Sequence, residues 1–218
     1  MFSIIRCLLT AATLGVSALA ALANDNPQDL LSAALRAGDV GAVTAALEAG
    51  ADPNGGTIPP LSIATARGDS GVVEVLLAVG ADPNTIDATG RSILMSALVR
   101  QRYSVAKVLV ANGVDVNLPE ENPAGRSPLQ LVIDESPSIE AMDLLLSAGA
   151  DINFRDARGE TALASAAFMN RPDAARYLIE KGADLSLRNN EGVSPLGRAL
   201  QRGNAEVIEL LRDAGMSD

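Results

Sequence analysis

The chain repeats one short phrase at nearly fixed intervals, and this repetition constrains its fold more than any other feature. The phrase is Gly-Ala-Asp, once changed to Gly-Val-Asp and once degenerate, and successive copies lie 30, 33, 36, 33 and 33 residues apart. Its glycines are Gly50, Gly80, Gly113, Gly149, Gly182 and Gly215. Each copy follows an amphipathic run that ends in apolar residues, as in Leu144-Leu145-Leu146. Because glycine readily adopts the left-handed conformation that closes a helix, each phrase predicts a helix end followed by a loop.

A second short helix is predicted after each loop, where a Pro-Leu pair or a similar pair follows a hydroxyl residue. Ser127, Thr161 and Ser194 are expected as N-caps. Pro128 and Pro195 then take the first helical position, where a backbone N–H is not needed. Ser127 and Gln130 also have the spacing of a capping box. Each repeat therefore holds two helices and one loop.

Two helices and a loop, with a [S/T]-P-L start and an L-L-x-x-G-A-D end, resemble the ankyrin repeat. The resemblance covers residues from about 27 to 215 and rests on five or six linked copies. It implies an all-α solenoid of about six helix-turn-helix repeats with protruding loops, in a domain of residues 24–218. Tetratricopeptide repeats have a similar length but carry a Trp, Tyr and Gly pattern, and this chain has no Trp.

The composition agrees with a stack of small helices. Of the 218 residues, 48% are apolar and only 2% aromatic, which favours small side chains between closely spaced helices over one bulky core. Leu145 and Leu178 take the same position in adjacent repeats, and both are expected to be buried. In such a stack stability is a sum over repeats and their interfaces.

The repeats depart from regularity in three places. The loop of repeat two, 54–59, is shortened, and Gln101 replaces the glycine found between the two helices of other repeats. The loop of repeat four, 118–125, is two residues longer than that of repeat three and contains Glu120 and Glu121. Insertions are expelled to loops, often on the binding edge, so this one is a candidate binding feature. A tolerated surface insertion is the alternative, since long loops cost little.

Residues 1–23 have the pattern of an export signal. Arg6 precedes an uncharged apolar run that starts at Cys7, and Ala21-Leu22-Ala23 forms a small-residue cleavage site. The mature protein is expected to begin at Asn24 and to be periplasmic or secreted, as an exported bacterial-type protein without membrane attachment. An uncleaved membrane anchor is the alternative. The mature chain then has no cysteine, so disulfides do not hold the fold.

The charged and nucleophilic residues exclude several function classes. Without Arg6, 16 basic and 27 acidic side chains give a net charge of −11, which argues against nucleic acid as a partner. The chain has no histidine, so the usual histidine-based nucleophile systems and zinc sites are not expected. No complete calcium-loop or nucleotide-binding motif is present. We therefore expect no catalytic residue, no metal and no cofactor.

The most regular acids are the loop aspartates, one at an equivalent position in each repeat: Asp52, Asp82, Asp115, Asp151 and Asp184. Aspartates of this kind cap backbone N–H groups in turns, and paired acid–base carboxylates should be unique rather than periodic. A structural role is therefore expected.

The position where the family carries a histidine after Pro-Leu holds Ser62, Met95, Gln130, Ala164 and Gly197. This departure puts the usual inter-repeat hydrogen bonds in question, but not the fold.

The resemblance implies recognition of a protein through the loop tips and the concave side of the first helices. We expect a monomeric, exported protein-protein interaction module that binds and masks, inhibits or protects a partner, for example a toxin or an envelope enzyme. The alternative is a carboxylate-based enzyme or a small-ligand-binding protein of the envelope.

Three groups of residues are candidates for partner binding. Arg67, Arg100 and Arg202 share one position near the end of the first helix, where they either meet an acidic partner or complement the helix dipole. Repeat five supplies an apolar anchor with an arginine rim, consisting of Phe154, Arg155, Arg158, Phe168 and Met169. Phe154 is expected at the loop tip; the alternative is that Phe154 packs on the next loop and Phe168 fills the groove between repeats. The third candidate is the long loop with Glu120 and Glu121.

Overall fold

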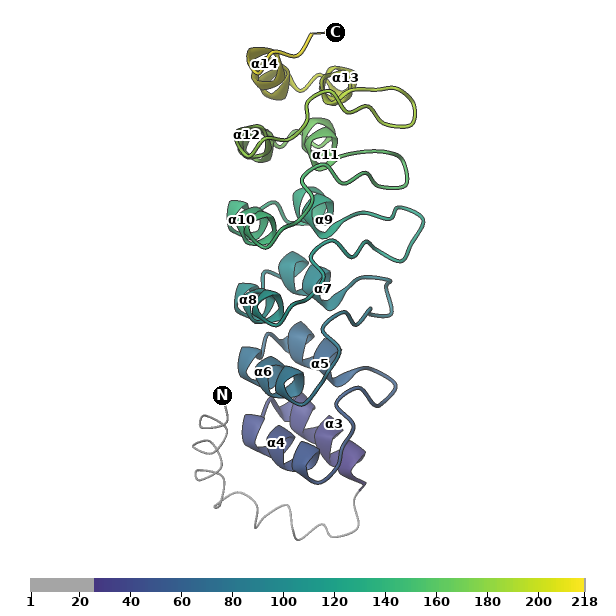
Figure 1. Ribbon diagram of the computed structural model, residues 1–218, viewed down its shortest axis with the longest axis vertical. Helices are drawn as coiled ribbons and strands as arrows, with labels where there is room; N and C mark the ends of the chain where they lie inside the picture. Colours follow the sequence, from purple (N-terminus) through teal and green to yellow (C-terminus); the bar gives the residue numbers. More distant parts are fainter. Residues whose placement is uncertain (1–25, 218) are drawn as a thin grey trace. The chain divides into compact units, whose positions relative to one another are not determined.

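The computed structural model describes residues 26–217, and within them it contains twelve helices and no strand (Figure 1). The predicted signal at residues 1–23 lies outside the described residues. One isolated β-bridge joins Ile86 and Ser92. The chain divides into two compact units between Thr85 and Ile86.

The first unit holds two helical pairs. The first pair is α3, Pro27–Ala37, and α4, Val40–Glu48; the second pair is α5, Pro60–Arg67, and α6, Ser70–Ala78. Helix α3 begins as expected, because the Asn26 side chain accepts a hydrogen bond from the backbone N–H of Gln28. Within the unit, α3 packs on α5 and α4 packs on α6.

The second unit stacks four helical pairs. The first helices are α7, Ile93–Val99, α9, Pro128–Glu135, α11, Ala162–Phe168, and α13, Pro195–Arg202. The second helices are α8, Tyr103–Ala111, α10, Ile139–Ser147, α12, Pro172–Glu180, and α14, Ala205–Asp213. In Figure 1 the first helices form one column and the second helices another, and the connecting loops project beside the first column. We call these connections finger loops.

The predicted helix starts are confirmed. The side chains of Ser127, Thr161 and Ser194 each accept a hydrogen bond from the backbone N–H three residues on. The reciprocal bond from the Ser127 N–H to the Gln130 side chain completes the capping box. Pro128 and Pro195 are the first helical residues.

Five of the six turns between the paired helices in the described residues contain a residue with positive φ. Gly38, Gly68 and Gly203 supply it in three repeats. In two further turns Gln101 and Asn170 take this conformation, with φ of 56° and 52°, whereas the turn between α9 and α10 contains no residue with positive φ. Since a Cβ atom is unfavourable there, these two positions carry backbone strain that glycine would avoid.

The core is made of small and branched apolar side chains, as the composition predicted. Leu145 and Leu178 are fully buried, which confirms their assigned positions in the repeat. Helix α11 buries four alanines, Ala162, Ala164, Ala166 and Ala167. None of the helices in residues 26–217 combines the length and the apolar character needed to cross a membrane.

At the position where the family carries a histidine, Gln130 makes a hydrogen bond in its place. The Gln130 side chain is buried, and its Nε2 donates to the backbone carbonyl of Glu160 at 2.7 Å. Gln130 therefore makes a hydrogen bond between repeats four and five. Ser62, at the same position in the first unit, has a buried Oγ with no hydrogen-bond partner among the described residues.

Candidate functional site

The periodic aspartates hold the finger loops, as predicted. Each one accepts a hydrogen bond at 2.8 to 2.9 Å from the backbone N–H two residues further on; the residues are Asp52, Asp82, Asp115, Asp151 and Asp184. The asparagine after such a turn also reaches the next repeat. Asn117, for example, donates to the carbonyl of Gly149 and accepts from the N–H of Asp151. These carboxylates therefore stabilise the backbone conformation of the finger loops.

A second turn forms the outer end of each finger loop in the second unit. In repeat five, Asp156 Oδ1 accepts from the N–H groups of Arg158 and Glu160, both at 2.8 Å. Neighbouring fingers are joined by backbone bonds from Ala157 N–H to the Ala124 carbonyl and from Asn190 N–H to the Arg158 carbonyl. The finger of repeat five is therefore held on both sides.

The long loop of repeat four is anchored by a buried carboxylate. Glu120 is only 3% exposed, and it accepts hydrogen bonds from Arg91 at 3.0 Å and from Arg126 at 2.8 and 3.1 Å. Glu135 contacts the same two arginines. We call these four residues the Glu120 cluster. The prediction that Glu120 contacts a partner directly was therefore wrong, because its carboxylate is enclosed between two guanidinium groups.

Glu121 is placed differently from its neighbour. Its side chain is exposed, and its backbone N–H donates to the carbonyl of Gly90 in the preceding finger at 2.7 Å. It remains accessible to a partner.

The Glu120 cluster borders a second acid, Asp134, near the end of α9. Arg126 Nη1 lies 3.2 Å from Asp134 Oδ2. Burial raises the pKa of Asp134, and hydrogen bonds from Arg126 and Ser165 offset this only in part. Burial opposes the charged form of Arg126 as well, but its bonds to Glu120 and Asp134 raise the pKa of the guanidinium beyond its ordinary value.

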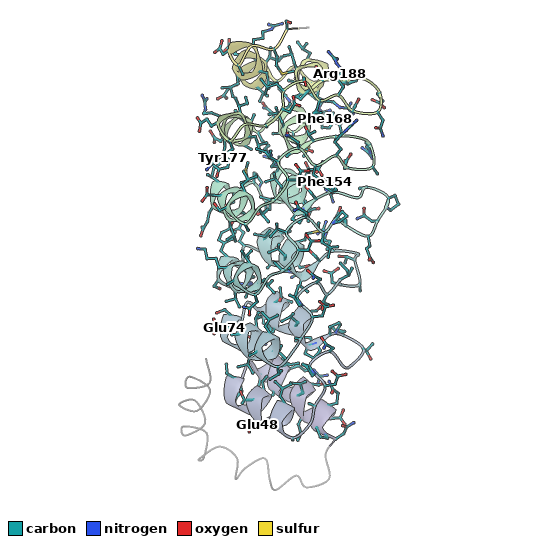
Figure 2. The ribbon with its side chains drawn as sticks, viewed as in Figure 1. Glu48, Glu74, Phe154, Phe168, Tyr177 and Arg188 are labelled. Atoms are coloured by element: carbon teal, nitrogen blue, oxygen red, sulfur yellow. The ribbon has the colours of Figure 1, made fainter. Side chains whose placement is uncertain are left out.

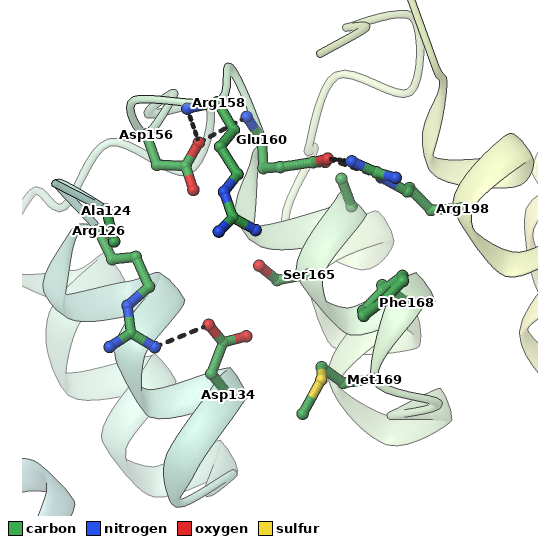
Figure 3. Close-up of a pocket in the computed structure, with 11 residues that line it drawn as sticks. Ala124, Arg126, Asp134, Asp156, Arg158, Glu160, Ser165, Phe168, Met169 and Arg198 are labelled. Atoms are coloured by element: carbon green, nitrogen blue, oxygen red, sulfur yellow. Dashed lines mark hydrogen bonds and ion pairs between the residues drawn. The ribbon is translucent and has the colours of Figure 1, made fainter. Parts of the chain in front are cut away.

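A hollow of about 410 Å³ opens between the finger of repeat five and the first helices (Figure 3). We call it the Arg158 hollow. Its charged lining residues are Arg126, Asp134, Asp156, Arg158, Glu160 and Arg198, and its other lining residues are Ala124, Ala164, Ser165, Phe168 and Met169. In Figure 3 the Arg158 side chain points from the finger into the hollow, toward Ser165. Helices α9, α11 and α13 and the finger loops thus build one concave site within the second unit.

One wall of the hollow is an ion pair between two repeats. Glu160 Oε1 receives hydrogen bonds from Arg198 and from Asn189, the latter at 2.7 Å. Glu160 Oε2 is buried and has no hydrogen-bond partner among the described residues. Glu160 stands at the repeat position that Arg91 and Arg126 occupy in the two preceding repeats. The sign of the charge at this position therefore reverses at the hollow.

The apolar part of the hollow lies at the end of α11. Phe168 and Met169 are 37% and 39% exposed, so both belong to the exposed large apolar side chains of the described residues. The Arg202 guanidinium lies 4.7 Å from the centre of the Phe168 ring, and that of Arg198 lies 5.7 Å from it. These distances are those of cation–π contacts. Phe168 thus combines an accessible apolar surface with an arginine rim, but this rim consists of Arg198 and Arg202 rather than the predicted Arg155 and Arg158.

Phe154 and Arg155 lie elsewhere. The prediction that Phe154 forms the loop tip was wrong: the outer turn is Asp156–Gly159, and Phe154 is half-buried beside the Asp151 turn. Figure 2 shows Phe154 next to the helices rather than at the end of the finger. Arg155 donates to the carbonyls of Gly159 and Arg188, so it connects two fingers. The structure brings only Arg158, Phe168 and Met169 of the repeat-five prediction into one site.

The three arginines at equivalent positions have different surroundings. In the first unit, Arg67 donates to the carbonyls of Arg36 and Ala37 at the end of α3 and pairs with Asp69. This is the helix-terminus role that the sequence left as an alternative. In the second unit Arg100 is exposed at the end of α7, and Arg202 covers the Phe168 ring.

Sequence reasoning missed Arg126, Asp134, Ser165 and Arg198. One signal was present: the residue before the N-cap is Arg91, Arg126, Glu160 and Val193 in successive repeats, so its charge changes. Among residues 26–217, no three or more His, Cys, Asp or Glu side chains are grouped so that they could hold a metal ion.

Comparison with known proteins gives the class. The family model "Ankyrin repeats (3 copies)" matches residues 30–120 and again residues 129–217. The chain therefore belongs to the ankyrin-repeat family. Ankyrin repeats are protein-protein interaction modules, so binding of a protein is the coarse function of this fold.

Three relatives illustrate the breadth of the family. The chain is 34% identical over 131 residues to ankyrin repeat domain-containing protein SAT10 of Stachybotrys chartarum, a match that covers 60% of this chain and 6% of that protein. It is 29% identical over 130 residues to ankyrin repeat and KH domain-containing protein mask-1 of Caenorhabditis elegans, covering 56% of this chain and 5% of mask-1. It is 36% identical over 101 residues to human protein phosphatase 1 regulatory subunit 27, covering 46% and 64% of the two chains. The chain thus spans less than two thirds of each relative.

Proposed function

We propose that this chain is an exported binding protein that masks, inhibits or protects a partner protein. The observation that carries the proposal is the pair of exposed apolar side chains, Phe168 and Met169, beside arginines on the concave side of α11. Exposed aromatic residues with an arginine rim are common among the residues that dominate binding energy. The family membership and the name of a phosphatase regulatory subunit among the relatives support a regulatory binding role.

Enzymatic or small-ligand function by carboxylates is the weaker alternative. The five periodic aspartates are engaged with backbone N–H groups, and Glu120 is enclosed by arginines. Asp134 is held by Arg126 and Ser165. These acids therefore lack the free partner that a general acid–base pair requires.

Export follows from the signal-like residues 1–23 and is part of the proposal. We expect the chain to be cleaved after Ala23 and to act in the periplasm or outside the cell, as a monomer that binds a toxin, an envelope enzyme or another envelope protein. N-terminal sequencing of the protein from the envelope fraction should give Asn24 as the first residue. Retention of Met1 in a membrane pellet would show an anchor instead.

The binding proposal is tested by affinity capture from the envelope fraction, with identification of the partner by mass spectrometry. The joint substitution of Phe168 and Met169 by alanine should weaken affinity for that partner by at least about tenfold, since such anchors contribute about 2 kcal/mol or more. The thermal midpoint should fall less than it does for a fully buried core residue, because both side chains are partly exposed. Tyr177→Ala is the matched control, since Figure 2 places Tyr177 on the second-helix column. Equal losses of affinity in the Phe168/Met169 double variant and in Tyr177→Ala would show that the concave site is not the binding surface.

A further inference from the structure

The Arg158 hollow holds one charged group that the protein itself leaves unused. Arg126 is bonded to Glu120 and Asp134, and Arg198 is bonded to Glu160 and Gln201. The Arg158 guanidinium, in contrast, has no hydrogen bond or ion pair with any residue in the described part of the chain. A guanidinium offers five donors in a planar fork that matches a carboxylate.

Arg158 is presented from a rigid support. Its N–H is held by Asp156, its carbonyl accepts from Asn190, and the adjacent Ala157 N–H is bonded to Ala124. Because the backbone around Arg158 is fixed from both neighbouring fingers, little main-chain ordering is needed when a ligand binds. The side chain points into the hollow, on the side where α11 presents Phe168 and Met169 (Figure 3).

The charges around the hollow select a singly charged anion. Asp134, Asp156 and Glu160 line it together with Arg158, and Arg126 and Arg198 are already paired. A carboxylate matches the one unpaired guanidinium. A phosphate group carries nearly twice that charge and would face the three nearby carboxylates, so the hollow disfavours it. The hollow's volume also lies in the range of sites that hold small groups rather than whole helices.

We propose, building on the proposed function, that the Arg158 hollow takes an extended peptide segment of the partner protein. A carboxylate of the segment pairs with Arg158, and an adjacent apolar side chain covers Phe168 and Met169. The carboxylate comes from a Glu or Asp side chain or from the C-terminus of the partner chain. Both sources present the same group to the guanidinium fork.

The test uses fluorescein-labelled synthetic peptides and the full protein in fluorescence anisotropy titrations. Each peptide carries one Leu or Phe and one carboxylate, either adjacent or a few residues apart. In one set the carboxylate is an internal Glu with an amidated C-terminus; in a second set it is the free C-terminus; a third set carries Gln and an amide. We expect at least one carboxylate set to bind about tenfold more tightly than the third set. The set that binds identifies the source of the carboxylate.

Variants connect the binding to the hollow. Arg158→Ala should lower affinity for the carboxylate peptides about tenfold and abolish their advantage over the Gln peptides. Arg158→Lys keeps the charge but not the fork, and it should recover only part of the affinity. Arg188→Ala is the control, because Arg188 lies just before the outer turn of the next finger, donates to the carbonyl of Gly192 and does not line the hollow. The affinity of the Arg188→Ala variant for the carboxylate peptides should match that of the wild type.

Several results would overturn the inference. Equal binding of Glu and Gln peptides, equal effects of Arg158→Ala and Arg188→Ala, tighter binding of a phosphoserine peptide, or no binding of any peptide would each do so. The proposed function is judged separately, by the captured partner. If that partner binds the wild type and the Arg158→Ala variant equally well, the protein is a binding module whose contact lies outside the hollow.

Discussion

At the residue scale, Glu120 is the side chain whose removal should show most clearly how repeat four is held. Its carboxylate is buried and accepts hydrogen bonds from Arg91 and Arg126. Glu120→Gln should lower the free energy of unfolding by about 2 kcal/mol, because it removes charge-assisted bonds and leaves two arginines less well paired. The neighbouring Glu121→Gln should change it little, since that side chain is exposed. Urea denaturation of the two variants measures the difference, and similar midpoints would contradict the assignment.

The same carboxylate predicts a dependence on pH. Burial by itself raises the pKa of Glu120, but the hydrogen bonds from Arg126 and Arg91 outweigh it and lower the pKa below its ordinary value. A lowered pKa adds stability above the unfolded pKa of about 4.3, and this stability is lost as the pH falls through the folded pKa. The gap between wild type and Glu120→Gln should therefore be constant from about pH 7 to pH 5 and narrow below about pH 4. If the stability difference between the wild type and Glu120→Gln widens in acid, the pKa of Glu120 is raised rather than lowered, and the Glu120 cluster does not stabilise the charged carboxylate.

Sequence reasoning at this scale succeeded where one residue acts on its own backbone. The Ser127, Thr161 and Ser194 caps and the Asp151 turn are local bonds, and each was predicted. It failed for Glu120, whose burial depends on arginines that precede α7 and α9 and meet only after the repeats stack. The length of a loop shows that the loop is unusual, but it does not show which of its acidic side chains are buried and which are exposed.

At the scale of elements, the finger of repeat five approaches the next finger too closely for a side chain at Gly159. Gly159 has φ of +74°, and a Cβ atom there would lie 2.5 Å from Asn190 Oδ1 and 3.0 Å from the Asn190 backbone N. Gly192, at the same place in the next finger, has φ of +78° and open space around it. Gly192→Ala should cost about 1 kcal/mol from backbone strain alone, and Gly159→Ala at least about 1 kcal/mol more. Equal thermal shifts would mean that the fingers separate easily.

The turns between paired helices offer a stabilising change. Gln101 has φ of 56° where other repeats use glycine, so Gln101→Gly should raise the free energy of unfolding by about 1 kcal/mol. The weak Gln101 Nε2 contact to Ser136 Oγ, at 3.3 Å, is lost in exchange. Asn170→Gly should gain less, because asparagine tolerates the left-handed conformation better. Chemical denaturation compares them; a larger gain at Asn170 would point to another source of strain.

The elements themselves were predictable because their signals repeat. The first helix begins after a hydroxyl residue in four repeats, and a glycine follows the second helix in all six, so an error in one repeat is corrected by the others. The Arg158 hollow was only half predictable. Phe168 and Met169 follow from the helix register, whereas Arg126 and Arg198 enter the site from the flanking repeats, at positions that their own repeats do not mark as special.

At the scale of the whole molecule, the described chain has no bulky aromatic core, and its cohesion comes from leucines repeated along the stack. Leu145 in α10 and Leu178 in α12 are both fully buried and belong to adjacent repeats of the second unit. In a repeat protein each unit contacts only its neighbours, so an interior leucine supports its own repeat and the interfaces on either side. No distant part of the fold replaces that contribution.

Leu145→Ala and Leu178→Ala should therefore each lower the free energy of unfolding by about 2 to 5 kcal/mol, through lost burial and a residual cavity. Leu200→Ala in α13 is the matched control, because this leucine is 41% exposed and its removal leaves no enclosed cavity. Urea midpoints followed by circular dichroism measure all three. If the two interior variants unfold at the same urea concentration as Leu200→Ala, the alanines and branched residues around them close the gaps, and the stack depends less on its leucines than their burial indicates.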